Sequence, residues 1–410
     1  MNNNINAPLP LFDSISFLEK NNLQNISQVP DSTHDYIHAK AFLKAYNGSE
    51  ATFNAYRREV ERLLHWSWLI ANKPVKDLRR QDIEDYLAFC QEPPLSWIGI
   101  KKVPRYIEKE AVRIPNSEWR PFVATVSKAA SRLGKQANPK QYELSQTALR
   151  EIFAILSSFY NFLIQEEYTE INPVMHIRQK SKFLRKRQGK PKIRRLTELQ
   201  WDYVVETAEQ LAQNNPITHE RTLFIMTALY AMYLRISELA ASERWVPKMC
   251  DFHRDHENCW WFTTVGKGNK ERQIAVSDRM LKSLKRYRQH LGFSALPSPA
   301  DTSPLLPKIK GKGPISNISY IREIVQNCFD DAILRLKNDG HVEDADSLNE
   351  ATVHWLRHTG ISDDVKHRPR EHVRDDAGHG SSATTDRYID IELRERHRTA
   401  RKKPISTLDT

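Results

Sequence analysis

The sequence is poor in the features that build disulfide scaffolds and membrane spans. Its 410 residues include only four cysteines, too few for a disulfide-stabilised fold and typical of a reducing compartment: Cys90, Cys250, Cys259 and Cys328. The longest apolar run, residues 223–234, is shorter than the roughly 18 residues of a membrane span and predicts a buried core helix. The opening MNNNINAPLPLF lacks the basic and apolar regions of a secretion signal. We therefore expect a cytoplasmic protein with no membrane association.

Basic residues outnumber acidic residues in this chain. The chain has 62 Lys and Arg against 51 Asp and Glu, a formal charge of +11. Such a balance favours a polyanionic partner. The length allows two or three domains, each with a core of its own.

Helical periodicity dominates the first half of the chain. Helices are predicted over residues 49–71, 79–90 and 145–168, with Ser49 as a cap and with Asn-Pro or Asn-Lys-Pro at two of the ends. Residues 1–35 are polar and Asn-rich, and we assign them no fold. The Pro-rich stretch 93–144 is too long for a simple loop, and we interpret it as an insertion with structure of its own.

A basic segment follows the third helix. Residues 178–195 hold ten basic residues and no acid: Arg178, Lys180, Lys182, Arg185, Lys186, Arg187, Lys190, Lys192, Arg194 and Arg195. One interpretation is a solvated linker. The other is a DNA-binding linker, because like charges this dense repel one another unless an anion lies among them. Fully extended, the segment would reach roughly 60 Å, enough to pass around a duplex.

The second half mixes helices with one predicted hairpin. Thr197 resembles a helix cap, residues 221–240 are expected to be helical and buried, and further helices are predicted at 278–291 and 318–337. Alternating apolar residues over 259–276, with Gly-Lys-Gly-Asn-Lys between them, predict a β-hairpin. The fold class is therefore mainly α with a small β-sheet.

Two motifs place arginines in helical surroundings. Arg235, in YLRISELAAS, could form a buried ion pair with Glu238. His354 and Arg357, in HWLRHTG, are three residues apart and share a helical face, and they could simply begin a capped helix.

Two further motifs complete a candidate set. Lys267 stands on the predicted hairpin turn, where a lysine is usually just solvated. The stretch GHGSSATTDRYI holds His379, which could be structural, and Tyr388, which could pack a helix onto a core. Taken together, two Arg, one Lys, two His and a Tyr without an acidic cluster are suited to attack a phosphodiester without a metal. Guanidinium groups match the charge that gathers on the phosphate oxygens, and a tyrosine hydroxyl can serve as the nucleophile.

The strings LRISEL, GKGNKER, HWLRHT and GHGSSATTDRYI, in this order, resemble the tyrosine recombinase (phage integrase) family. The resemblance implies that Tyr388 forms a 3′-phosphotyrosyl bond and that Arg235 and Arg357 clamp the scissile phosphate. It also implies Lys267 as general acid, His354 in proton transfer and His379 bonded to a phosphate oxygen.

The resemblance also implies a domain plan. Residues 36–177 are expected to form an all-helical core-binding domain carrying the insertion, with 178–195 as the linker. Residues 196–392 would be a mixed α+β catalytic domain, and 393–410 a C-terminal tail that often docks on a neighbouring protomer in this family. The expected partners are double-stranded DNA with attachment-type sites, further copies of the chain in a tetramer on synapsed DNA, and an accessory DNA-bending or directionality protein. No cofactor is expected, and the setting would be the bacterial nucleoid.

The sequence departs from the family pattern at two positions near the motifs. Family members usually carry Gly before the Leu-Arg pair, where this chain has Tyr233, and Ala377 replaces a common Leu before Gly378. A polar segment also follows LRHT in place of the usual apolar helix. We therefore expect unusual packing behind the site, with every catalytic position retained.

The expected function is site-specific DNA recombination, serving integration or excision of a mobile element. Two alternatives remain: a type IB topoisomerase with the same chemistry, and a non-enzymatic DNA-binding protein. A zinc site is a separate hypothesis, because four possible ligands occur within ten residues: Cys250, His253, His256 and Cys259. Their even spacing is unlike that of zinc sites, which pair close ligands, so no metal is expected.

Overall fold

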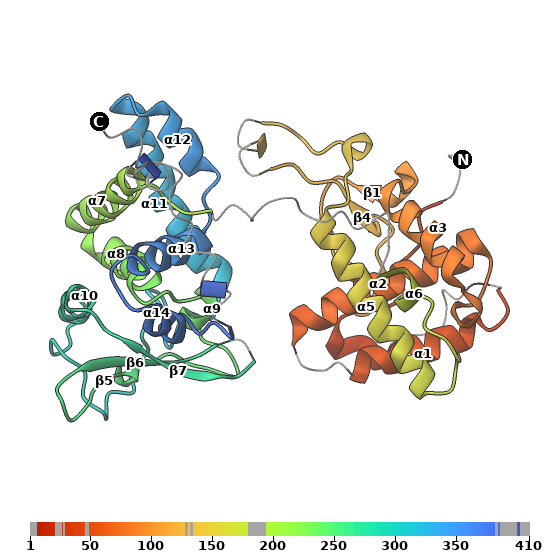
Figure 1. Cartoon of the computed structure of the whole chain (residues 1–410), viewed down its shortest axis with the longest axis horizontal. Coiled ribbons are helices and arrows are strands. Elements are labelled where there is room, and N and C mark those ends of the chain that lie inside the picture. Colours follow the sequence, from red (N-terminus) through yellow and green to blue (C-terminus); the bar gives the residue numbers. More distant parts are fainter. Residues whose placement is uncertain are drawn as a thin grey trace, which may run out of the picture. The chain divides into compact units, whose positions relative to one another are not determined.

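The computed structural model describes residues 6–20, 27, 29–45, 49–127, 130–131, 134–178, 194–266, 268–381, 384–385 and 400–401. The chain divides into an N-terminal unit, Met1–Gln188, and a C-terminal unit, Gly189–Thr410 (Figure 1). The boundary falls within the basic segment 178–195. Each unit has its own large hydrophobic core.

Helices make up the body of the N-terminal unit. They are α1 (Ser32–Ala45), α2 (Glu50–Trp66), α3 (Arg80–Gln91), α5 (Gln146–Gln165) and α6 (Met175–Arg178), with short turns η1 (Ile15–Lys20), η2 (Ser67–Ala71) and η3 (Val75–Asp77). The predicted cap Ser49 is confirmed, since its side chain accepts from the backbone N–H of Thr52. Helices α1 and α2 pack against α5.

Helix α5 is the one helix in the described ranges that is long and apolar enough to cross a membrane. Leu149, Ile152, Phe153, Leu156 and Leu163 of α5 are buried in the N-terminal core. The core helix of a water-soluble domain meets the same length and composition test.

The insertion 93–144 has its own elements. After η4 (Leu95–Trp97), strand β1 (Ile98–Gly99) pairs in parallel with β4 (Phe122–Val123), and β2 (Tyr106–Lys109) forms a hairpin with β3 (Val112–Pro115). The short turn η5 (Pro139–Gln141) precedes α5. Trp97 and Phe122 are fully buried, so the insertion is anchored in the N-terminal core. The unit is therefore helical outside its insertion, which adds two small sheets.

The segment before α1, to which the sequence assigned no fold, also reaches this core. Leu11, Phe12 and Leu18 are buried there. The buried carboxylate of Glu61 accepts hydrogen bonds from the backbone N–H groups of Leu11 and Phe12. No sequence pattern indicates these two hydrogen bonds to α2. Composition alone therefore could not place the segment.

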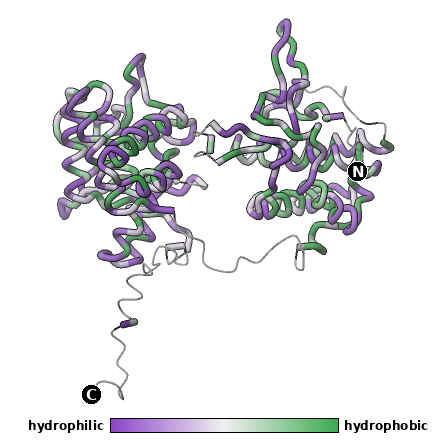
Figure 2. Tube along the Cα trace, turned by 90° about the horizontal axis from the view of Figure 1, so that it is seen from above, coloured by the Kyte–Doolittle hydropathy of each residue, from purple (hydrophilic) through white to green (hydrophobic). Residues whose placement is uncertain are grey.

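The C-terminal unit surrounds the apolar helix α8. Its helices are α7 (Glu198–Asn214), α8 (Pro216–Ala231), α9 (Ile236–Leu239), α10 (Asp278–His290), α11 (Ile318–Asn338), α12 (Val342–Asn349), α13 (Val353–Asp364) and α14 (Arg370–Ala377). Helix α8 packs against α7, α10 and α13. Thr197 caps α7 in a capping box with Gln200, as predicted. Figure 2 shows apolar and hydrophilic residues interspersed along the helices of both units, as expected for helices with one face in a core.

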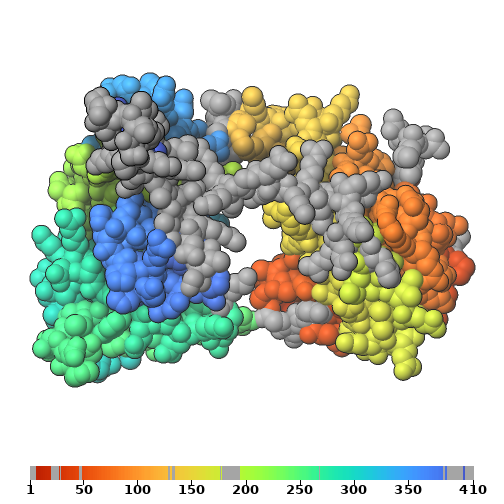
Figure 3. Space-filling view, viewed as in Figure 1, coloured from red at the N-terminus to blue at the C-terminus, as the bar shows by residue number. Residues whose placement is uncertain are grey.

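A three-stranded antiparallel sheet lies beside α14. The short turn η6 (Met249–Asp251) leads into β5 (Phe252–Arg254), and the order is β5–β6–β7 with β6 (Trp260–Val265) and β7 (Glu271–Ala275). The β6–β7 pair is the predicted hairpin, with Trp261 opposite Ala275 and Val265 opposite Glu271. Helix α14 packs against β7, and Figure 3 shows the blue α13–α14 region directly next to the green and teal sheet. This contact brings the GHG motif to the hairpin.

Candidate active site

Arg357 joins three segments of the C-terminal unit. It lies on α13 and is buried, with 2% of its surface exposed. One terminal nitrogen, Nη1, donates to the backbone carbonyl of Tyr233 after α8, and Nη2 donates to the carbonyl of Ala377 at the end of α14, at 2.5 Å. The guanidinium orientation is thus fixed by main-chain groups.

Tyr233 holds the turn between α8 and the LRISEL motif in a left-handed conformation, with φ of 49°. For a non-glycine residue this conformation costs about 1–2 kcal/mol. The side chain offsets that cost, because its hydroxyl donates to the Asp364 carboxylate and accepts from Arg368 at 2.9 Å. Burial, and then the Asp364 charge, raise the pKa of Tyr233 well above its ordinary value, so the hydroxyl remains a donor. The left-handed position before the LRISEL motif is therefore occupied by a Tyr that its own hydroxyl anchors.

The two residues that depart from the family pattern, Tyr233 and Ala377, lie in one cluster. Tyr233, Ile361, Val373 and Ala377 form a small hydrophobic cluster behind the site. A larger side chain at 233 and a smaller one at 377 share this space, so the volumes compensate. Gly360 lets α13 approach α8 closely, because a Cβ there would collide with the carbonyl oxygen of Tyr230.

Arg235, Glu238 and Arg272 form a compact ion cluster. Glu238 accepts from the Arg235 guanidinium at 2.9 Å and from both terminal nitrogens of Arg272 at 2.8 Å. Burial alone would raise the pKa of Glu238, but its hydrogen bonds and attraction to Arg272, and then to Arg235, lower it below its ordinary value. Arg235 retains 29% side-chain exposure, so it remains accessible to a ligand. The suggested ion pair with Glu238 is real, and it orients Arg235 while leaving it accessible.

Arg272 is a site residue that the sequence reasoning missed. Its Nε donates to the carbonyl of Asp376 at 2.9 Å, so it ties β7 to α14. Gly378 is required there for two reasons: its φ is 63°, and a Cβ would lie 2.8 Å from Cδ of Arg272. Arg272 is the final residue of GKGNKER. Its place in the same motif as the predicted Lys267 was the sequence signal that could have indicated it.

Two predicted histidines lie within reach of the same arginine charges. Partial burial, and then Arg357 and Arg235, lower the pKa of His354. Burial, and then Arg357, Arg235 and Arg272, lower the pKa of His379 to about 4. Near neutral pH, His379 is therefore uncharged. The Thr385 hydroxyl, 2.9 Å from Nδ1, can donate to that nitrogen, which places the ring proton on Nε2.

A third histidine, His358, was also missed. Its ring meets that of His354 edge-on, with centroids 4.3 Å apart. Burial, and then the charges of neighbours including His354, lower its pKa to about 4. Its position four residues after His354 on α13 was the sequence signal.

The structure thus brings together four of the six predicted catalytic residues: Arg235, His354, Arg357 and His379. Lys267 and Tyr388 lie outside the described residues. Gly266, directly before Lys267, lies against the ion cluster: a Cβ there would be 2.9 Å from Nη1 of Arg272 and 3.2 Å from Oε1 of Glu238.

The basic linker is described only at its two ends. Its members from Lys180 to Lys192 lie outside the described residues, as do the tail residues 393–399 and 402–410. Arg178 ends α6, and Arg194 and Arg195 precede α7.

The four residues of the zinc hypothesis do not converge. His253 Nδ1 lies 3.2 Å from the carbonyl of Asp251, whereas the nearest charged partner of His256 is the adjacent Glu257. Cys259 is exposed and Cys250 is half-buried. Within the described ranges, no group of three or more His, Cys, Asp or Glu side chains is placed to hold a metal ion.

Comparison with known proteins gives partial sequence matches. No family model matches the sequence. The tyrosine recombinase XerD of Rickettsia prowazekii is 30% identical over 154 residues, 37% of this chain and 45% of XerD. A tyrosine recombinase of Pseudothermotoga lettingae is 24% identical over 163 residues, 39% of this chain and 49% of that protein. Over about two fifths of its length, the chain is therefore similar in sequence to tyrosine recombinases. The match spans about half the length of these relatives.

The fold likeness to solved tyrosine recombinases is wider than the sequence match. The post-cleavage complex of XerH with palindromic difH DNA gives a TM-score of 0.52 at 14% identity, over 91% of this chain and 90% of XerH. The Tn1549 transposon integrase in complex with circular intermediate DNA gives 0.50 at 13% identity, over 90% of this chain and 98% of the integrase. The recombinase fold, mainly α with small sheets, therefore extends over both units.

Proposed function

We propose that this chain is a site-specific DNA recombinase that cleaves and rejoins duplex DNA through a 3′-phosphotyrosyl intermediate. The observation that carries the proposal is the arrangement of Arg235, Arg357 and His379 around one location, oriented by Glu238 and by main-chain carbonyls. Pre-oriented cationic donors of this kind stabilise the charge that develops on the phosphate oxygens of a transferring phosphoryl group.

The proposed first step exchanges one phosphate ester for another. The Tyr388 hydroxyl attacks the scissile phosphorus, the bond from phosphorus to the 5′ oxygen breaks, and Lys267 gives that oxygen a proton. The phenolic proton passes to a base of the site, with His354 as the candidate. In the second step, the 5′ hydroxyl of a partner strand attacks the phosphorus and gives its proton to Lys267. The bond from phosphorus to the Tyr388 oxygen breaks, and the protonated base returns the phenolic proton. The ester bond is conserved throughout, so rejoining needs no added energy source.

The proposal extends to the DNA partner and the assembly. The N-terminal unit and the linker 178–195 would hold the duplex, with the basic side chains of the linker against backbone phosphates. Four copies on two synapsed attachment sites would exchange strands for integration or excision of a mobile element. A crystal structure of a lambda integrase dimer (residues 75–356) on a COC′ core site, similar in fold with a TM-score of 0.50 at 14% identity, supports assembly on DNA.

A covalent-adduct assay tests this function. The protein would be incubated with a nicked candidate attachment-site duplex, and the product would be digested and examined by mass spectrometry. We expect a DNA-linked peptide containing Tyr388, and transfer of the linked strand to a second duplex. Religation of only the original strand would indicate a topoisomerase-like activity, and binding without an adduct would indicate a non-enzymatic DNA-binding protein.

Tyr233→Phe should lower both stability and the cleavage rate. The change removes the hydroxyl between Asp364 and Arg368, and loss of a hydrogen bond to a charged group typically costs about 1.5–3 kcal/mol. The carbonyl of the same residue holds Arg357, so relaxation of this turn should also slow adduct formation. Urea denaturation and single-turnover cleavage would measure the two effects.

Tyr230→Phe is the matched control, because the Tyr230 hydroxyl donates to Asp363 at 3.0 Å from an ordinary helical position. It should lose some stability and cleave normally once folded. If both variants slow cleavage equally, the turn at Tyr233 has no positioning role.

A further inference from the structure

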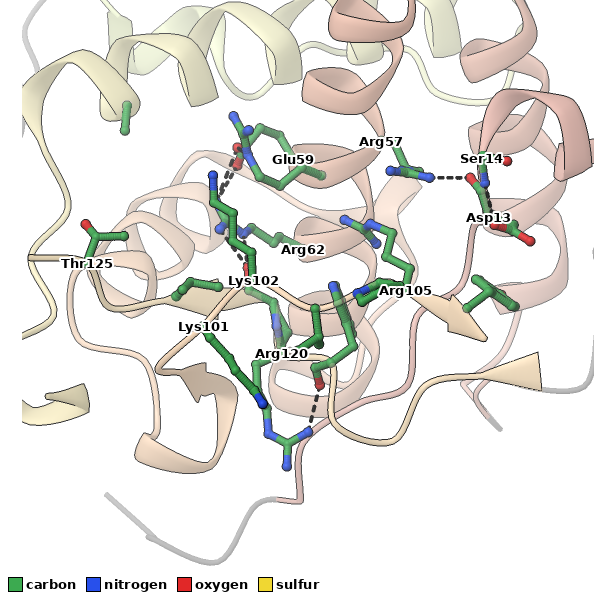
Figure 4. Close-up of a pocket in the computed structure, with 18 of the residues that line it drawn as sticks. Asp13, Ser14, Arg57, Glu59, Arg62, Lys101, Lys102, Arg105, Arg120 and Thr125 are labelled. Carbon is green, nitrogen blue, oxygen red and sulfur yellow. Dashed lines mark hydrogen bonds and ion pairs between the residues drawn. The ribbon is translucent and has the colours of Figure 1, made fainter. Parts of the chain in front are cut away.

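The N-terminal unit contains a pocket between α2 and the insertion, far in sequence from the motifs of the candidate active site (Figure 4). Its volume of about 640 Å³ lies within the roughly 300–1,000 Å³ of small-molecule sites. Eight cationic side chains line it against three acidic ones, Asp13, Glu59 and Glu151. The cations are Arg57, Arg58, Arg62, Lys101, Lys102, Arg105, Arg113 and Arg120.

Internal ion pairs neutralise only part of this charge. Arg58 pairs with Glu59 and Glu151, and Arg62 also pairs with Glu59. Arg113 pairs with Asp13, and Arg105 pairs with Glu61 behind the pocket. The remaining four cations have no carboxylate within 4.0 Å among the described residues: Arg57, Lys101, Lys102 and Arg120. Figure 4 shows cationic side chains from α2 and from the insertion around the same space.

Two arginines of the pocket wall, Arg57 and Arg105, are desolvated by burial. The Nε atom of Arg57 is buried and has no hydrogen-bond partner in the described part of the chain. Burial lowers the pKa of Arg57 to about 10. Burial, and then the charge of Arg57, hold the pKa of Arg105 well below its ordinary value. An anion in the pocket would stabilise these desolvated like charges.

We propose that this pocket binds a phosphate group. Guanidinium forks and flexible ammonium groups together match the several oxygens and the multiple charge of phosphate or pyrophosphate. The phosphate could be supplied by a free phosphate ester or by a nucleic-acid backbone, and the pocket chemistry is the same for both. The insertion 93–144 thereby gains a function, since it contributes Lys101, Lys102, Arg105, Arg113 and Arg120.

Calorimetric titration of pyrophosphate into the full-length protein, in low-salt buffer without DNA, tests this binding. The probe variant is Lys101→Ala/Lys102→Ala, since both side chains are exposed and their removal should leave the fold intact. The matched control is Lys109→Ala/Lys140→Ala, which removes two exposed charges from the same insertion outside the pocket. We expect the probe variant to bind pyrophosphate at least about tenfold more weakly than the wild type, and the control to bind within about twofold.

A repeat of the titration with saturating duplex DNA distinguishes the two sources of phosphate. If the duplex removes the Lys101- and Lys102-dependent binding, the pocket takes a backbone phosphate; if that binding persists, the pocket takes a free phosphate compound. Equal affinity in the two double variants, or no pyrophosphate binding at all, would overturn the proposal. Because the comparison needs no cleavage, the proposal stands or falls separately from the recombinase activity of the C-terminal unit.

Discussion

Replacing Tyr388 by Phe should abolish the covalent protein–DNA adduct and leave DNA affinity within about twofold of the wild type. The change removes one oxygen, the proposed nucleophile. The proposed phosphate-binding groups, Arg235 and Arg357, remain. Denaturing gel electrophoresis of a nicked, labelled substrate would detect the adduct, and a mobility-shift titration would give the affinity.

Tyr320→Phe provides the matched control. Tyr320 lies in the first turn of α11 and is 38% exposed, so loss of its hydroxyl should leave adduct formation unchanged. An adduct that persists in Tyr388→Phe would assign the nucleophile to another residue. If Tyr388→Phe lost DNA binding together with the adduct, the substitution would have altered the structure. The circular dichroism spectra of Tyr388→Phe and Tyr320→Phe would then differ.

Site residues could be predicted from the sequence only where they belong to a short motif. Arg235, His354, Arg357 and His379 could be proposed as site residues because each stands in a string whose order along the chain is specific. Glu238 was considered only as an ordinary ion-pair partner, yet it orients Arg235 by accepting from two arginines. Such roles depend on long-range contacts, which periodicity does not encode.

Tyr233 is a second case in which long-range contacts decide the local structure. The sequence predicts unusual packing here, because the family pattern has Gly at this position. In the structure Tyr233 adopts a left-handed conformation, and Asp364 and Arg368 hold its hydroxyl from 131 and 135 residues along the chain. Tertiary hydrogen bonds thus stabilise a conformation that usually requires Gly, and no spacing in the sequence indicates those bonds.

The fold was predictable where helices carry a clear apolar face and a cap. Ser49 and Thr197 marked helix starts correctly, and alternation over 259–276 marked the hairpin. The insertion was not assigned elements, because its strands are only two to four residues long. The segment before α1 was also left unassigned, and both regions are anchored by single residues such as Phe12 and Trp97.

The role of Lys267 can be separated from that of the arginines by changing the leaving group. A general acid contributes when the departing oxygen is a poor leaving group, typically by about 10²–10⁴-fold, whereas Arg235 stabilises phosphate charge whatever group departs. Sulfur in place of the bridging 5′ oxygen leaves as a thiolate without a proton, because thiol pKa values lie near 8.5.

Lys267→Ala should therefore cleave ordinary DNA slowly and cleave the sulfur-bridged substrate at close to the wild-type rate. Arg235→Ala should remain slow on both substrates. The measurement is the single-turnover rate of adduct formation with each enzyme and substrate pair. If sulfur fails to restore the rate of Lys267→Ala, the lysine acts by charge or positioning and the proton comes from another group. Lys270 is the next candidate, because its carbonyl accepts from the Gly266 N–H at 2.8 Å and closes the same turn against the Arg235–Glu238 cluster.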